Sequence, residues 1–333
     1  MKEKPLLTVP SSIRVTLPAP PALRFSSPFA RAFLSAGKGT RWEKKLIRSL
    51  YSLFHRRLGL PAPGRMILAS GRSFPIDGRE TAFLEFAARS MSEGGFEPEV
   101  SALLTHLAAR LSVVYDAGAN WGYYPLLLGT DPRFKGRVHA FEIRPQTAAL
   151  LSGVVRSAGL EERVSVHAFG LSSKDGEVRL TREKHSYLCR IVGEDYRGPT
   201  DLVAVRRLDR TDLPPPDFIK IDVEGHEAAV LAGAERLLAR RRPMIVFESW
   251  YEKDAPERML APLHLLARQG YALFRLLWRP ERAEREGTLA FQPLEPQDRP
   301  AVGEAQNLFA LHPERAGAFF SAESRARGAK LRR

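Results

Sequence analysis

The chain has 333 residues, of which 44% are hydrophobic and 27% are charged, a composition that supports one large folded domain with extensions and excludes general disorder. No stretch approaches the ~20 consecutive apolar residues of a membrane-spanning helix, so we do not expect an integral membrane protein. The single cysteine, Cys189, excludes an intrachain disulfide and a multi-cysteine zinc site, and we expect a cytoplasmic protein.

The formal net charge of +13 is concentrated at the two ends of the chain. Residues 1–60 contain twelve Lys or Arg and two acids, and residues 324–333 contain five Lys or Arg and no acid. The sequence between these ends is close to neutral. We interpret the basic ends as solvated segments, so the charge does not by itself indicate a nucleic-acid partner.

The N-terminal part of the chain has two distinct segments. Residues 1–40 are rich in proline and poor in acids, which indicates a disordered basic extension. Residues 41–58 have the spacing of an amphipathic helix, with basic residues on most of its surface and six apolar residues near one face: Trp42, Leu46, Leu50, Leu53, Phe54 and Leu58. Two interpretations are open: a helix packed on the main domain, which we favour, and a helix that contacts a membrane surface.

The remaining N-terminal region, up to residue 110, is predicted to form a hairpin over 65–77 and helices over 79–91 and 98–109. From Val113 onward, short apolar runs alternate with helical stretches. The predicted strands are VVYDAG, VHAFE, VSVHAF, DFIKIDV and MIVFES, followed by residues 271–278 and 307–312. A polar insertion over 279–306 separates the last two strands. The predicted helices are 122–129, 145–158, 226–240 and 256–268. This alternation predicts an α/β domain over 111–315 with a mostly parallel sheet, followed by a basic tail over 316–333.

The first two strands of this domain predict a nucleoside site. Gly118 and Gly122 follow the first strand, where they let the backbone turn sharply and approach a ligand. Glu142 ends the second strand, where a carboxylate can accept hydrogen bonds from a ribose diol. The glycine spacing is not the G-x-G-x-x-G of nicotinamide dinucleotide sites, and Asp116 suits an ammonium better than a pyrophosphate. These features favour S-adenosylmethionine over a nicotinamide cofactor.

The fourth and fifth strands end in a group of acids. Asp222 and Glu224 alternate as the fourth strand ends, so an extended backbone projects both the same way. His226 opens the following helix, and Glu248 ends the fifth strand. Because parallel strands end at the same edge of a sheet, we expect these four side chains to converge as a general-base group. His226 has an alternative interpretation as a helix cap.

The segments GGFEP (94–98), VVYDAGANWGYY (113–124), HAFEIRP (139–145), RRLDRTDL (206–213), FIKIDVEGHEAAVLAGAERLL (218–238) and IVFE (245–248) resemble the FkbM family of S-adenosylmethionine-dependent methyltransferases. This resemblance implies a Rossmann-like class I fold, with seven strands of which the last is antiparallel, and an N-terminal helical extension. It further implies which residues line the cofactor. The methionine end would be lined by Asp116, Gly118, Asn120 and Gly122. Glu142 would bind the ribose, and Ala168 and Phe169 would contact the adenine.

The resemblance implies methylation of a hydroxyl on a sugar-containing or polyketide-like metabolite. Asp222 or His226 would take the proton, with Glu224 or Glu248 orienting. Some sugar O-methyltransferases of this fold use a divalent metal held by carboxylates, and Asp222 with Glu248 could provide one. The alternatives are a protein or RNA acceptor, and a non-catalytic binding protein that uses its basic ends. The oligomeric state cannot be read from the sequence.

Overall fold

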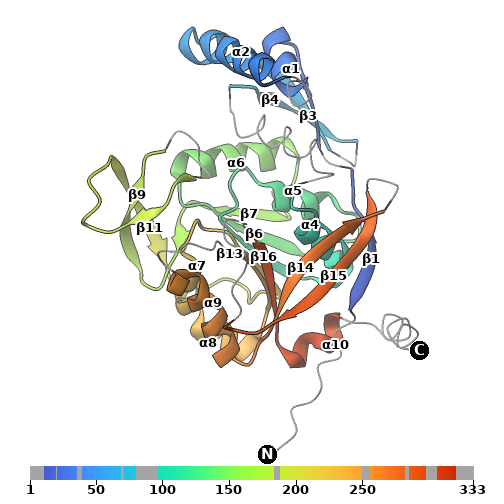
Figure 1. Ribbon diagram of the computed structural model, residues 1–333, viewed down its shortest axis with the longest axis vertical. Helices are drawn as coiled ribbons and strands as arrows, with labels where there is room; N and C mark the ends of the chain where they lie inside the picture. Colours follow the sequence, from blue (N-terminus) through green and yellow to red (C-terminus); the bar gives the residue numbers. More distant parts are fainter. Residues whose placement is uncertain are drawn as a thin grey trace, which may run out of the picture.

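Buried apolar runs form the centre of a nine-stranded sheet in the computed structural model (Figure 1). The structure describes residues 11–19, 21–35, 40–68, 71–79, 96–183, 188–249, 256–281, 285–297 and 306–319. In order across the sheet, the strands are β1 (Ser12–Thr16), β15 (Glu286–Leu294), β14 (Ala272–Pro280), β16 (Gln306–Leu311), β13 (Met244–Ser249), β12 (Phe218–Ile221), β5 (Val113–Ala117), β6 (Arg137–Phe141) and β7 (Val164–His167).

The strands from β7 to β14 reproduce the expected seven-stranded arrangement. β7, β6, β5, β12 and β13 pair in parallel, whereas β16 pairs antiparallel with both β13 and β14. The last strand in the chain, β16, is therefore the antiparallel one, and the predicted Rossmann-like class I fold is confirmed. The carboxyl ends of β5, β6, β12 and β13 consequently meet at one edge of the sheet.

The expected number of strands was too small, because β15 and β1 extend the sheet beyond β14. β15 lies inside the segment predicted as a polar insertion. It forms a strand because Leu289 and Phe291 alternate with more polar neighbours and bury their side chains in the core. β1 then covers the other edge of β15 and buries Ile13 and Val15.

Helices cover both faces of the sheet, and each face has its own hydrophobic cluster. One face packs against α4 (Pro98–Leu107), α5 (Tyr123–Thr130) and α6 (Pro145–Ser157). The other packs against α7 (Glu227–Ala232), α8 (Glu235–Arg241) and α9 (Pro256–Arg268). The single helix predicted over 226–240 is divided at Gly233, because this residue lies against the backbone of Ser172, where a Cβ would approach the carbonyl oxygen to 2.0 Å.

Residues 11–19 and 21–35 are ordered, which differs from the disordered extension predicted for residues 1–40. Besides β1, they form β2 (Ala22–Phe25) and α1 (Pro28–Ser35). β2 pairs with β3 (Pro63–Ile67), and β3 pairs with β4 (Ser73–Asp77), which confirms the predicted hairpin and adds a third strand to it. The proline content wrongly indicated disorder. No proline lies within β1 or β2, so the alternation of apolar residues within each strand is not interrupted.

The predicted amphipathic helix is α2 (Arg41–Tyr51), which continues as a π-helical turn, η2 (Ser52–Arg57). α1 and α2 lie side by side next to β3 and β4, away from the main sheet (Figure 1). The predicted helix over 98–109 corresponds to α4 and a 3-10 turn, η3 (Ala108–Arg110), whereas the helix predicted over 79–91 lies, apart from Arg79, outside the described residues. Of the predicted basic tail, the description includes only α10 (Ala316–Phe319), which follows a 3-10 turn, η6 (Pro313–Arg315).

A second, four-stranded sheet lies between β7 and β12 in the chain. Its order is β10 (Ile191–Val192), β9 (Gly176–Thr181), β11 (Thr200–Arg206) and β8 (Gly170–Leu171), and a 3-10 turn, η5 (Leu208–Arg210), follows it. This sheet projects beside β7 and α7 in Figure 1. None of the helices described is long and apolar enough to cross a membrane.

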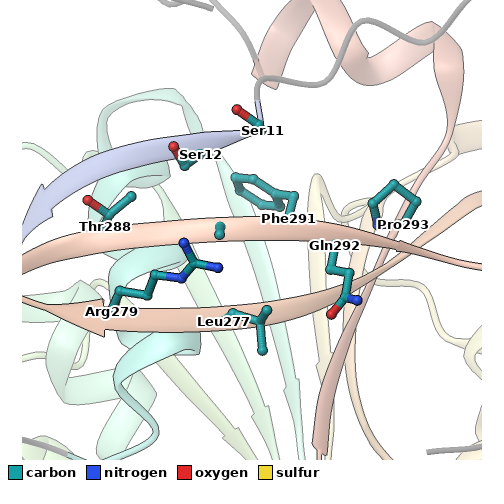
Figure 2. A pocket seen from close by; sticks show the side chains of 9 residues that line it. Ser11, Ser12, Leu277, Arg279, Thr288, Phe291, Gln292 and Pro293 are labelled. Carbon is teal, nitrogen blue, oxygen red and sulfur yellow. The ribbon is translucent and has the colours of Figure 1, made fainter. Parts of the chain in front are cut away.

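A hollow of about 460 Å³ lies over β1, β14 and β15 (Figure 2). Figure 2 shows Leu277 and Arg279 on one strand and Thr288 and Gln292 on its neighbour. None of the site residues predicted from the sequence lines this hollow. The predicted site residues lie instead at the carboxyl edge of the sheet.

Candidate functional site

The loop that follows β5 turns back on itself directly beside the end of β12. Gly118, Asn120 and Gly122 all have positive φ angles, of 82°, 50° and 102°. A Cβ on Gly118 would lie 1.7 Å from the carbonyl oxygen of Asp222, so only glycine fits between the two loops. The backbone N–H of Gly118 donates to the carbonyl of Phe141, 3.0 Å away, which fixes the loop against β6 as well.

Asp116, at the end of β5, is a buried carboxylate in need of a cation. Its side chain is 1% exposed, and neither carboxylate oxygen has a hydrogen-bond partner within the described part of the chain. Burial raises the pKa of Asp116 to about 6; the charge of Lys220 opposes this shift and that of Asp222 adds to it. A buried carboxylate without partners destabilises a protein unless a ligand satisfies it, so this position suits a positively charged group.

Glu142, at the end of β6, links two loops. Its Oε2 accepts a hydrogen bond from the backbone N–H of Asn120 at 3.0 Å, and its Oε1 accepts one from the N–H of Arg144 at 2.8 Å. Burial raises the pKa of Glu142 to about 7, although these two hydrogen bonds oppose the shift. A carboxylate has about four lone-pair positions, so Glu142 retains the capacity to accept hydroxyl hydrogen bonds from a ribose.

The two residues predicted at the adenine position lie just after β7. Ala168 is exposed, and Phe169 is half-buried. The guanidinium carbon of Arg206 lies 4.6 Å from the centroid of the Phe169 ring, and the ring of Phe141 lies 5.7 Å from it. The Phe169 ring is thus held in place by Arg206 and Phe141, at the same edge of the sheet as Glu142.

Three of the four predicted acid–base residues come together. Asp222, Glu224 and Glu248 are half-buried, and one carboxylate oxygen of each lies within 4.8 Å of the other two; we call them the acid triad. The reason differs from the predicted one, because the backbone at Glu224 is left-handed, with φ 54°, rather than extended. Carboxylate oxygens are the ligands that hard divalent cations prefer, so the acid triad could also hold Mg²⁺ or a similar ion.

His226 does not join the acid triad. It is the N-cap residue of α7, and its Nε2 lies 2.9 Å from the hydroxyl oxygen of Ser172, next to β8. His226 therefore lies outside the group of three mutually close carboxylates, after the left-handed turn over Glu224 and Gly225, and its role in proton transfer stays a prediction. Glu227 fixes that turn by accepting hydrogen bonds from the N–H groups of Val223 and Gly225.

A buried network lies behind the acid triad, and it contains Lys220, for which the sequence left two interpretations open: a buried ion-pair partner or a functional residue. Lys220 is 4% exposed, and its Nζ lies 2.8 Å from Oδ2 of Asp222. The same Nζ lies 4.9 Å from the centroid of the Tyr124 ring, and the Tyr124 hydroxyl donates a hydrogen bond to Glu97. Burial alone would lower the pKa of Lys220, but the charges of Asp222, Glu97 and Asp116 outweigh it and raise the pKa, so the ammonium stays charged.

Glu97 lies just before α4, far in the sequence from the strands β12 and β13 that carry the acid triad. It precedes α4 in a left-handed conformation, and burial raises its pKa to about 7 despite the nearby Lys220. The first turn of α4 is held at the site by a 2.8 Å hydrogen bond from Nδ2 of Asn307 to Glu99. Asn307 pairs with Glu248 across β16 and β13, so α4 brings its acids beside the acid triad. The GGFEP block was the only signal of this in the sequence.

The chain is similar to known methyltransferases. The model of the methyltransferase FkbM domain matches residues 116–273. A curated relative, the hexuronic acid methyltransferase AglP of Haloferax volcanii, is 28% identical over 43% of this chain and 58% of its own length. The chain thus spans less than two thirds of that relative.

Solved structures also match this chain at low identity. A methyltransferase FkbM from Methylobacillus flagellatus is 19% identical, with 64% of this chain and 60% of that one covered and a TM-score of 0.36. An O-methyltransferase from Bacillus cereus in complex with SAH is 14% identical, with 70% and 89% covered and a TM-score of 0.40.

Proposed function

We propose, from the match of residues 116–273 to the methyltransferase FkbM domain, that this chain transfers the methyl group of S-adenosylmethionine to a hydroxyl group of a sugar-containing or polyketide-like acceptor. The name of the curated relative, a hexuronic acid methyltransferase, favours the sugar-containing class. The observation that carries the proposal is the position of the acid triad beside the buried Asp116 at one edge of the sheet.

The residues at the ends of β5 and β6 fit this cofactor. Asp116 would face the ammonium of its methionine part, which would supply the positive charge that the orphaned carboxylate needs. The turn formed by Gly118, Asn120 and Gly122 would let backbone N–H groups approach the cofactor carboxylate, and Glu142 would accept hydrogen bonds from the ribose. Ala168 and Phe169 would contact the adenine. When bound, the cofactor supplies a methyl group already activated by a sulfonium.

The protein's task in such a reaction is to position the acceptor and remove its proton. Asp222 is the residue we assign as the base, with Glu224 and Glu248 orienting the acceptor hydroxyl. Lys220 holds Asp222 through its 2.8 Å ion pair and prevents the carboxylate from rotating away. Because His226 bonds Ser172, we assign it to the loop structure rather than to proton transfer.

A metal-assisted version of the same reaction would use the acid triad as ligands. The chemistry of three carboxylates suits a divalent cation, which would lower the pKa of an acceptor hydroxyl. The two versions differ in one measurement: the metal-assisted reaction stops after treatment with EDTA and recovers with Mg²⁺ or Mn²⁺, whereas the reaction with a carboxylate base is unaffected.

The proposed function is tested by incubating the protein with methyl-labelled S-adenosylmethionine and a set of neutral glycosides, uronic acid glycosides and polyketide glycosides. We expect label in an acid- and base-stable ether on one class, and at least a hundredfold loss of rate in Asp222→Asn. Asp131→Asn is the matched control, because Asp131 follows α5 and pairs with Arg133 on the surface. Label recovered only on protein or RNA, or equal rates in both variants, would refute the proposal.

A further inference from the structure

Exposed large apolar side chains are concentrated in one short part of the described chain. Seven such side chains are exposed among the described residues, and five of them lie between residues 42 and 60. They are Trp42, Leu46, Leu53, Leu58 and Leu60. Trp42 is 71% exposed, although tryptophan is a residue that folded proteins usually bury. Single exposed leucines are common on protein surfaces, but a group of exposed apolar side chains in one segment indicates an interaction surface.

The apolar side of α2 faces away from the protein. Trp42 and Leu46 are one helical turn apart, and Leu53 follows almost two turns later on the same side; we call these three residues the outer stripe. The interpretation favoured from the sequence, a helix packed on the main domain, did not specify which side of the helix is buried, and the outer stripe is not that side. The helix packs instead through its opposite side, where Tyr51 and His55 are buried.

Contacts on the buried side fix the orientation of the helix. The Tyr51 hydroxyl donates a hydrogen bond to the carbonyl of Gly78. The His55 ring bonds the hydroxyl of Ser27 through Nε2 and the carbonyl of Leu60 through Nδ1, both at 2.8 Å. Because polar groups satisfied in this way would be lost if the helix rotated, the outer stripe cannot turn inward without breaking them.

The charge of the segment is strongly positive. Residues 41–57 contain six Lys or Arg and one acid, Glu43. That acid is used at the start of the helix, where its carboxylate accepts hydrogen bonds from the N–H and hydroxyl of Thr40, and the Thr40 hydroxyl accepts one from the Glu43 N–H. This reciprocal cap fixes the helix start and leaves the segment cationic.

We propose that α2 and η2 dock the protein onto an anionic lipid surface, with the outer stripe inserted among the lipids and the flanking basic residues beside the headgroups. A basic helix with a narrow apolar side that contains tryptophan has the chemistry of an interfacial helix. Nucleic acid would use the positive charge but not the apolar stripe. A second copy of the chain would cover the stripe but would bring two cationic helices together.

The proposal is tested by sedimentation of the full chain with vesicles of phosphatidylcholine alone and with vesicles that also contain the anionic lipid phosphatidylglycerol. We expect binding only to the anionic vesicles, a decrease as salt is raised, and at least about a tenfold loss in a W42S/L46S double variant. Leu202→Ser is the matched control, because Leu202 is 68% exposed on β11, outside the segment.

Three results would overturn the proposal. One is equal vesicle binding by W42S/L46S and Leu202→Ser when both variants unfold at the wild-type temperature. The second is binding of single-stranded RNA without any binding of vesicles. The third is a concentration-dependent dimer that dissociates in W42S/L46S while no variant binds lipid, which would assign the outer stripe to contacts between copies.

Discussion

Replacing Asp116 with asparagine should stabilise the protein while weakening its binding of S-adenosylmethionine. In the absence of a ligand, burial holds the pKa of Asp116 at about 6, compared with 3.8 for an ordinary aspartate. Each pKa unit corresponds to about 1.36 kcal/mol, so ionising this carboxylate in the folded state costs about 3 kcal/mol near neutral pH. Asparagine has the same shape and no charge to bury.

The pH dependence gives this prediction its sign. Because the pKa of Asp116 is higher in the folded state than in the unfolded state, the folded state binds more protons between pH 4 and 6, and stability falls as the pH rises through that range. Well below the unfolded pKa of 3.8 the carboxyl is protonated in both states, and the penalty disappears. The stability difference between Asp116→Asn and wild type should therefore be near zero at about pH 3 and approach about 3 kcal/mol above pH 7.

Urea denaturation followed by circular dichroism at several pH values measures this difference, and a calorimetric titration measures the affinity for the cofactor. We expect Asp116→Asn to bind S-adenosylmethionine at least about tenfold more weakly, because the ammonium loses its charged partner. A variant less stable than wild type at pH 7, or a difference that does not change with pH, would refute the inference that Asp116 is a buried charge which Lys220 compensates only in part.

Three further predictions concern neighbouring positions. Gly118→Ala should lose at least about 2 kcal/mol of stability, since its backbone is left-handed and its Cβ would meet the Asp222 carbonyl. Gly153→Ala in α6, where a Cβ meets nothing within 4 Å, should instead gain about 0.5–1 kcal/mol. The urea midpoints of the two variants measure this difference. His226→Ala should lower kcat less than about tenfold and Asp222→Asn far more, and the reverse order in steady-state assays would reassign the base. Lys220→Met should lower stability by about 3–5 kcal/mol, because it leaves the surrounding carboxylates without their buried cation, and a loss under 1 kcal/mol in urea melts would argue against the network.

The central sheet could be predicted from the sequence because its signals are local. Each buried strand is a short apolar run, and the acids that follow it necessarily lie at the same edge of a parallel sheet. Asp116, Glu142, Asp222 and Glu248 therefore reached their observed edge by topology alone. The sharp turn at Gly118 was predicted as well, but its close packing against the carbonyl of Asp222 was not, because that contact joins two loops about a hundred residues apart.

The errors arose where distant contacts decide the structure. β1 is a five-residue strand within a proline-rich segment, and it is ordered because β15 provides a partner some 270 residues later in the chain. Glu97 joins the site only because Asn307 and α5 hold the start of α4 there. The direction of the outer stripe of α2 depends on the contacts of Tyr51 and His55, which helical periodicity does not encode.

Calorimetric titration with S-adenosylmethionine, S-adenosylhomocysteine and NAD is the most direct test of the proposed cofactor site at the ends of β5 and β6. We predict micromolar binding of the two adenosyl-sulfur ligands by the wild type and by Gly153→Ala, no binding of NAD, and loss of binding in Glu142→Ala. A folded protein that binds neither adenosyl-sulfur ligand, or that binds both equally well without Glu142, would contradict the account.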